Sequence, residues 1–125
     1  MLVMKLINGN YGVCRLDKDD KIPEWAYEGE LFSITKTEEE LSILCLQENI
    51  PTGVKFEGDW RILKVEGPLD FSLIGILSKI SGILALQNIS IFAVSTYDTD
   101  YILVKENNIN TAVKALRGQG YEIKD

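Results

Sequence analysis

The chain has 125 residues, of which 46% are hydrophobic and 26% charged, and its formal net charge is −6. This length fits one compact domain or two very small ones. The acidic excess disfavours nucleic acid as a partner, because phosphate binding relies on clustered lysine and arginine. We find no secretion signal, no basic amphipathic helix and no apolar run of about 20 residues, the length that spans a membrane. We therefore expect a cytoplasmic protein that binds neither nucleic acid nor a membrane.

Histidine is absent, and the two cysteines are Cys14 and Cys45. The absence of histidine excludes Ser-His-Asp and Cys-His nucleophiles, a histidine general base and histidine-ligated zinc. The separation of the cysteines excludes a CxxC redox or zinc motif, and we expect both to be buried free thiols. Glycine-rich nucleotide motifs are also missing. The sequence therefore predicts neither an enzyme nor a bound metal or cofactor.

The first half of the chain, residues 1–58, is expected to be rich in strands. Alternating or apolar runs predict four of them, at residues 1–8, 11–16, 31–35 and 41–46. Asn8-Gly9-Asn10 is a turn signal between the first two strands. Residues 17–21 form a charged loop, and Pro23 opens a short helical turn. Residues 37–40 predict either a tight turn or a single helical turn.

The second half, residues 59–125, predicts six elements in the order strand, helix, strand, strand, helix, strand. The expected strands are 60–65, a buried strand at 89–96, 101–105 and 121–124, and the helices begin at Phe71 and Asn110. Leu73, Leu77, Ile80 and Leu84 form the apolar stripe of the first helix. This order is that of the ferredoxin-like βαββαβ fold, an α+β architecture with an antiparallel sheet.

An internal similarity links the two halves. Ser33 and Thr37, followed by Glu40 and an apolar strand, resemble Ser95 and Thr99, followed by Asp100 and an apolar strand. The first copy has two more residues between the threonine and the acid. The pattern favours a duplication, although such common residues also recur by chance.

Several segments of the chain resemble a known family. Residues 60–77 and 89–104 are similar to the ACT-like family of small bacterial and archaeal tandem proteins. The most specific segment is Ser-Thr-Tyr-Asp-Thr-Asp-Tyr at residues 95–101. The first half matches through Ile22-Pro23-x-Trp25-Ala26 and Thr37-x-x-Glu40-Leu41-Ser42. One departure is Asn88, where ACT domains commonly have a glycine before the second strand; asparagine also adopts left-handed geometry.

The resemblance implies two ACT-like units in tandem, with their sheets paired side by side. It also implies a small ligand, usually an amino acid, held at an interface between units or subunits. We therefore expect a sensor module that forms a homodimer and acts on an unknown regulated protein. A structural or interaction protein that has lost its ligand pocket is the alternative.

Two segments provide the chemistry that an amino acid zwitterion needs. Backbone N–H groups at the entry to the first helix suit a carboxylate, because unpaired donors and the helix dipole favour an anion there. The residues of that loop are Gly67, Pro68, Leu69, Asp70 and Phe71. An ordinary loop in which Asp70 caps the helix is the competing interpretation.

Asp100 is the predicted partner for a ligand ammonium or guanidinium group, since an acid beside an apolar strand pairs strongly with a cation. The competing interpretation is a turn aspartate that bonds its own backbone. The other candidate ligand-binding residues near it are Ser95, Thr96, Tyr97 and Thr99. Glu40 is predicted to hold the equivalent position in the first half and to line a second site.

Overall fold

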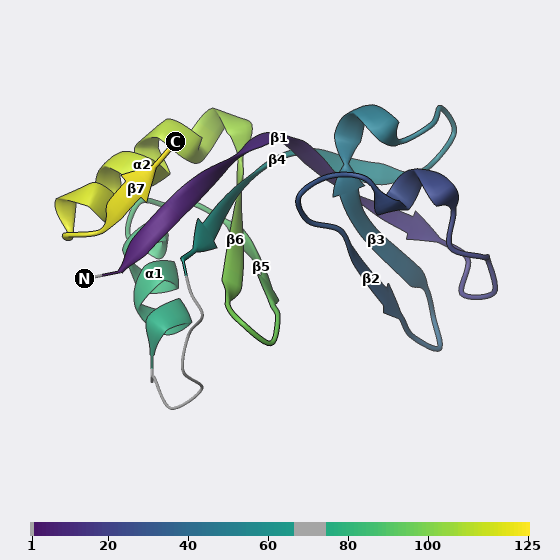
Figure 1. The fold of residues 1–125 in the computed structure, drawn as a ribbon, viewed down its shortest axis with the longest axis horizontal. Helices are drawn as coiled ribbons and strands as arrows, with labels where there is room; N and C mark the ends of the chain where they lie inside the picture. The colour runs from purple at the N-terminus through teal and green to yellow at the C-terminus, as the bar shows by residue number, and fades with distance from the viewer. Residues whose placement is uncertain (1, 67–74) are drawn as a thin grey trace. The chain divides into compact units, whose positions relative to one another are not determined.

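The computed structural model describes residues 2–66 and 75–125, and it divides into two compact units (Figure 1). We call Gly9–Trp60 the small unit, and Met1–Asn8 with Arg61–Asp125 the large unit. The expected domain boundary between residues 58 and 59 falls inside a strand. The first eight residues of the chain join the unit that is otherwise built from its C-terminal half.

Strand β1 (Val3–Leu16) is continuous where a turn was predicted at residues 8–10, so that prediction is wrong. An Asn-Gly turn closes a hairpin only when the strands on both sides pair with each other. Here the beginning of β1 pairs with a strand at the C-terminus, and its last six residues pair with β3 (Leu41–Leu46). Gly9 therefore takes its positive φ of 95° inside an extended strand.

The large unit has mixed α and β elements in the predicted order. After the first part of β1 come β4 (Phe56–Val65), α1 (Ile76–Ala85), β5 (Ile91–Ser95), β6 (Asp100–Lys105), the 3-10 turn Glu106–Asn108, α2 (Ile109–Gly118) and β7 (Glu122–Lys124). The strand order is β5-β6-β4-β1, and β7 pairs with β1 in parallel. The start of β1 thus lies between the first and the last strand of the βαββαβ series.

Both helices pack on the same face of this sheet (Figure 1). Alternate strand residues share one face, and those that meet the helices are Met4, Leu63, Val65, Ile102, Val104 and Ile123. Helix α1 contributes Ile80 and Leu84 from the predicted stripe, and α2 contributes Ala112 and Leu116. One apolar core therefore fixes the helices and the β4, β6 and β7 strands together.

The structure tests three local predictions in the large unit, for a strand, a helix start and a left-handed residue. The strand expected to be buried at residues 89–96 is shorter and only partly covered, because β5 is the edge strand of its sheet. Helix α2 begins one residue before Asn110, since the preceding 3-10 turn leads directly into it. Asn88 is left-handed with a φ of 58°, which confirms the prediction that this asparagine adopts left-handed geometry before the second strand of the unit.

The small unit follows the same connection order with shorter helical elements. Its elements are residues 9–16 of β1, the 3-10 turn Glu24–Tyr27, β2 (Ser33–Lys36), β3, the 3-10 turn Gln47–Asn49 and the first part of β4. The strand order is β2-β3-β1-β4. The predicted turn after Pro23 is confirmed, and its Ala26 and Trp25 cover the core formed with Ile43.

Cys14 and Cys45 are free and buried in this core, as predicted. They lie on neighbouring antiparallel strands, where Cys14 is opposite Ile43 and Cys45 is opposite Gly12. Burial raises the pKa of the Cys14 thiol, and burial together with the adjacent Cys14 raises the pKa of Cys45 to about 12. Both thiols therefore stay protonated and unreactive at neutral pH.

The raised thiol pKa values predict that stability falls with alkaline pH. Above the ordinary thiol pKa of about 8.5, the unfolded chain loses these protons while the folded chain keeps them. The unfolding free energy should then drop between pH 8 and pH 10, by at most about 1.4 kcal/mol per pH unit for each thiol. Urea unfolding across this range measures the slope. The slope should be smaller for Cys45→Ala, and an identical slope in that variant would contradict the assignment.

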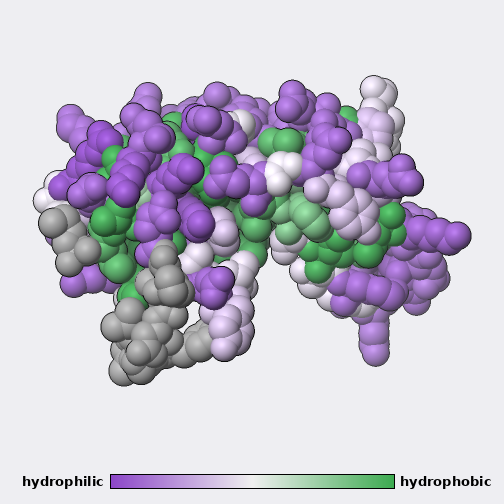
Figure 2. Space-filling model, viewed as in Figure 1, coloured by the Kyte–Doolittle hydropathy of each residue, from purple (hydrophilic) through white to green (hydrophobic). Residues whose placement is uncertain are grey.

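The visible surface is largely hydrophilic, with smaller hydrophobic patches between the polar residues (Figure 2). The large hydrophobic side chains that remain exposed are Ile22, Tyr27, Phe32, Phe56, Leu86 and Tyr97. Among the described residues, no helix is long and apolar enough to cross a membrane.

Candidate functional site

The hairpin between β5 and β6 brings together five of the eleven predicted ligand-binding residues. Its strands pair up to Ser95 and Asp100, and residues 96–99 form the turn. The Thr96 N–H donates to the Thr99 carbonyl (2.8 Å), and the Thr99 N–H donates to the Thr96 hydroxyl oxygen (3.3 Å). The turn is thus closed by backbone and side-chain bonds of its own residues, which fixes the direction of both flanking strands.

Thr99 anchors this hairpin to the end of β4. Thr99 is buried, with 5% of its surface exposed, and it is the one polar residue among the described residues that is buried. Its hydroxyl donates a hydrogen bond to the Val65 carbonyl. Val65 is the last residue of β4, so Thr99 ties the hairpin to the strand that leads toward the predicted carboxylate loop. We infer a positioning function for this hydroxyl rather than contact with a ligand.

Thr99→Val should lower the unfolding free energy by about 1–3 kcal/mol, because the buried Val65 carbonyl would lose its hydroxyl donor. Valine keeps the branched shape of threonine, so packing changes little. Thr111→Val, on the exposed side of α2, is the matched control and should stay within about 0.5 kcal/mol of the wild type. Equal unfolding free energies for the two variants in urea titrations would show that the Thr99 bond contributes nothing.

Asp100 is half-buried at the first position of β6. Its Oδ1 atom accepts a hydrogen bond from the Ser95 hydroxyl at 2.6 Å, across the register pair. Within the part of the chain that the structure describes, Asp100 has no cationic partner. The Ser95 hydroxyl therefore holds the carboxylate in place through its Oδ1 atom. Tyr97, at the tip of the turn, is 83% exposed.

The β2–β3 hairpin of the small unit repeats this turn in detail. The Thr37 N–H donates to the Glu40 carbonyl (2.9 Å), and the Glu39 and Glu40 N–H groups donate to the Thr37 hydroxyl oxygen (3.1 Å each). Thr37 is thus the counterpart of Thr96, and of the two alternatives predicted for residues 37–40 the tight turn is the one observed.

This correspondence shifts the internal alignment of the sequence. With Thr37 matched to Thr96, Glu40 falls on Thr99 and Leu41 on Asp100, since Lys36 pairs with Leu41 as Ser95 pairs with Asp100. No extra residues are then needed in the first copy. The small unit has a leucine where Asp100 stands, so Glu40 is not its equivalent.

The structure brings Ser95, Thr96, Thr99 and Asp100 into one hairpin, whereas Glu40 lies in the other unit. The predicted carboxylate loop, Gly67 to Phe71, lies outside the described residues.

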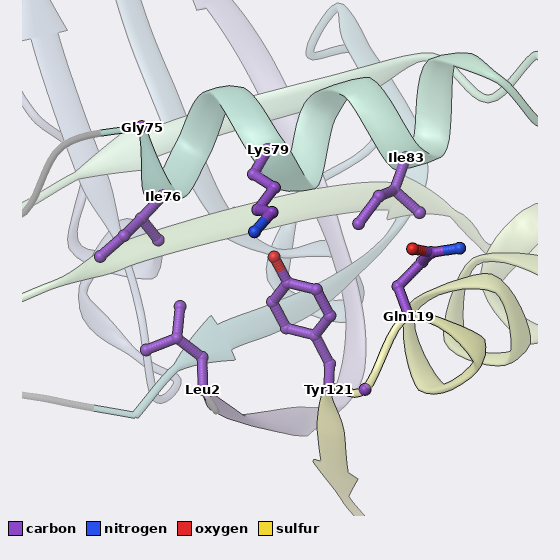
Figure 3. Close-up of a pocket in the computed structure, with 8 residues that line it drawn as sticks. Leu2, Gly75, Ile76, Lys79, Ile83, Gln119 and Tyr121 are labelled. Carbon is purple, nitrogen blue, oxygen red and sulfur yellow. The ribbon is translucent and has the colours of Figure 1, made fainter.

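The sequence reasoning missed a pocket in the large unit, beside α1 (Figure 3). It has a volume of about 650 Å³ and is lined by Leu2, Gly75, Ile76, Lys79, Ile83, Gln119, Gly120 and Tyr121. These residues come from the N-terminus, from α1 and from the turn after α2, so no sequence motif unites them. The local sequence at this place, Gly118-Gln-Gly120, is typical of a helix end and does not indicate a pocket.

Residues 2–66 and 75–125 contain no group of three or more acidic or cysteine side chains that could hold a metal ion. The site chemistry available in the described residues is therefore that of hydrogen bonds, the half-buried Asp100 carboxylate in the hairpin and one lysine in the pocket.

Comparison with known proteins identifies several relatives. The human cytosolic arginine sensor for mTORC1 subunit 1 is 37% identical over 59 residues, which are 46% of this chain and 18% of the sensor. The chain thus spans about a fifth of the curated relatives it matches. A crystal structure of an Agobacterium tumefaciens protein is 38% identical and has a TM-score of 0.91, covering 98% of this chain and 91% of that one.

More distant structures share the fold. The regulatory subunit of aspartate kinase from Thermus thermophilus is 9% identical with a TM-score of 0.64, over 90% of this chain and 93% of that one. A family model described as an N-terminal domain matches residues 9–53, and the ACT domain model matches residues 55–118. Neither model describes a catalytic domain. The match to the ACT domain model covers half of this chain, and the chain therefore belongs to the ACT domain family.

Proposed function

We propose that this protein is a regulatory module that binds a free amino acid in the cytoplasm and has no catalytic activity of its own. The observation that carries the proposal is the Asp100 carboxylate, which is oriented by Ser95 in the hairpin and has no cationic partner among the described residues. This hairpin lies inside the segment that matches the ACT domain model. The match to an arginine sensor and the fold shared with an aspartate kinase regulatory subunit support the same function.

In this proposal Asp100 binds the ammonium or guanidinium group of the ligand. Charge-assisted bonds of this kind are about twice as strong as neutral ones, and partial burial of the carboxylate reduces competition from water. Ser95 and Thr96 add hydroxyl groups along the exposed edge of the hairpin. The ligand carboxylate would bind the loop formed by Gly67, Pro68, Leu69, Asp70 and Phe71.

We further propose that the chain contains two ACT-like repeats in tandem, a reduced one in the small unit and a complete one in the large unit. The repeated Thr37 and Thr96 turns support a duplication. The small unit's strand order, β2-β3-β1-β4, supports it as well, because it is the order of a βαββαβ sheet. In the small unit, 3-10 turns stand where a complete repeat has helices.

A homodimer formed by edge-to-edge pairing is part of the proposal. In the described sheet β5 is an edge strand, and its Ile91 and Val94 side chains are only half-buried. Pairing would cover this edge and bury its apolar surface. Light scattering should give about twice the 14.1 kDa of the single chain at micromolar concentration. A single-chain mass with and without ligand would contradict the dimer.

A thermal-shift screen of the twenty amino acids tests the proposed function. A ligand at a hundredfold excess over its Kd adds about 2.7 kcal/mol to the unfolding free energy and raises the melting temperature. We expect such an increase for at least one amino acid. If no amino acid raises the melting temperature, the competing function, a structural or interaction protein without a ligand pocket, is favoured.

A further inference from the structure

We propose that the pocket beside α1 binds a monocarboxylate with an apolar chain, of the size of a medium-chain fatty acid. Its volume of about 650 Å³ lies within the range of about 300–1,000 Å³ that is typical of small-molecule sites. All its lining residues belong to the large unit, and none belongs to the β5–β6 hairpin. The pocket is therefore separate from the hairpin site of the proposed amino-acid function.

The walls of the pocket are apolar. Leu2, Ile76 and Ile83 each pack partly on the main core and leave the rest of their surface toward the pocket. In Figure 3, Ile76 and Ile83 project from α1, and Leu2 lies opposite them. An alkyl chain between these side chains would remove apolar surface from water, which is favourable.

Two polar groups of the pocket face each other between these walls. Figure 3 shows the Lys79 ammonium and the Tyr121 hydroxyl directed toward each other, whereas the Gln119 amide lies beside Ile83. Among the described residues, Lys79 has no acidic partner, and no acidic side chain lines the pocket. An ammonium without a counter-charge next to a hydroxyl donor is a suitable site for an anion.

The ligand's charge and shape follow from these groups. Burial raises the pKa of the Tyr121 hydroxyl, so this group is protonated at neutral pH and can donate a hydrogen bond to an anion. One lysine and one neutral donor match a carboxylate, which carries one charge and two acceptor oxygens, better than a phosphate dianion. The described lining residues include no acidic group and so offer no partner for an ammonium, which disfavours a free amino acid here.

The turn after α2 holds Tyr121 in position. The N–H groups of Gly120 and Tyr121 donate to the Arg117 carbonyl (3.0 Å) and to the Leu116 carbonyl (3.1 Å). This arrangement requires the left-handed backbone of Gly120, whose φ is 94°. The next residue, Glu122, donates its N–H to the Leu2 carbonyl (3.2 Å), so the same turn also fixes the wall opposite α1.

Titration calorimetry with octanoate and with 1-octanol tests the proposal, since the two probes share the chain and differ in the carboxylate. We expect the wild type to bind octanoate more tightly than octanol. Lys79→Met should weaken octanoate binding about five- to thirtyfold and leave octanol binding unchanged. Tyr121→Phe should weaken octanoate binding about threefold. Lys114→Met, which removes an exposed lysine of α2 outside the pocket, is the matched control and should change neither affinity.

The proposal is overturned if octanoate shows no saturable binding at millimolar concentration. It is also overturned if the wild type and Lys79→Met bind octanoate equally, or if Lys114→Met weakens binding as much as Lys79→Met. Asp100→Asn should leave octanoate affinity intact. The pocket and the hairpin can therefore fail independently, because loss of amino-acid binding in that variant does not affect the result for octanoate.

Discussion

Leu84→Ala is expected to lower the unfolding free energy by about 2–5 kcal/mol, a large share of the total stability of a small domain. Leu84 is fully buried in α1 and belongs to the core that joins both helices to the sheet of the large unit. Truncation removes its apolar contacts and leaves a cavity that close-packed neighbours fill only in part. Urea unfolding followed by far-UV circular dichroism measures the loss.

The control for this variant lies two residues further along the chain. Leu86 is 84% exposed at the end of α1, so Leu86→Ala makes the same chemical change without a cavity and should cost less than about 0.5 kcal/mol. If Leu84→Ala cost as little as Leu86→Ala, the placement of α1 on the sheet would be wrong.

Asp100→Asn is expected to weaken amino-acid binding about 10- to 150-fold, the equivalent of about 1.5–3 kcal/mol for a bond to a charged group. The asparagine Oδ1 atom still accepts the Ser95 hydroxyl bond, so the hairpin and the melting temperature should change little. Titration calorimetry with the amino acid found in the thermal-shift screen gives both affinities.

Asp98→Asn is the matched control for Asp100→Asn. Asp98 is an exposed acid in the same turn, so the variant loses the same charge at nearly the same place. Its affinity should stay within about twofold of the wild type, because exposed charges are screened by water and salt. Equal losses in both variants would point to a general charge effect and would remove Asp100 from the site.

Elements of both units could be predicted where their local signals agree with their packing. The stripe that includes Ile80 and Leu84 has helical spacing and indeed faces the core. The run from Leu41 to Leu46 is apolar enough to be a buried strand and is one. The tight turns at Thr37 and Thr96 follow from threonine hydroxyls that bond the backbone nearby.

The main errors have one physical origin. The local sequence does not show which distant segments pair or pack with each other. Asn8-Gly9 is a hairpin signal, but the two parts of β1 pair with strands far away in the chain, and the strand continues. The equivalence of Glu40 and Asp100 failed for the same reason, because only the strand register shows that Glu40 matches Thr99. The pocket at Lys79 and Tyr121 needed the packed helices to become visible.

Equilibrium dialysis of the chain against a mixture of all twenty amino acids tests the central claim most directly. The amino acids on each side of the membrane are then quantified, with Asp100→Asn in a parallel cell. An ACT module that senses a free amino acid should retain one of them at a ratio near one per chain, and the variant should retain much less. Equal concentrations of all twenty on both sides, at millimolar levels, would contradict the account.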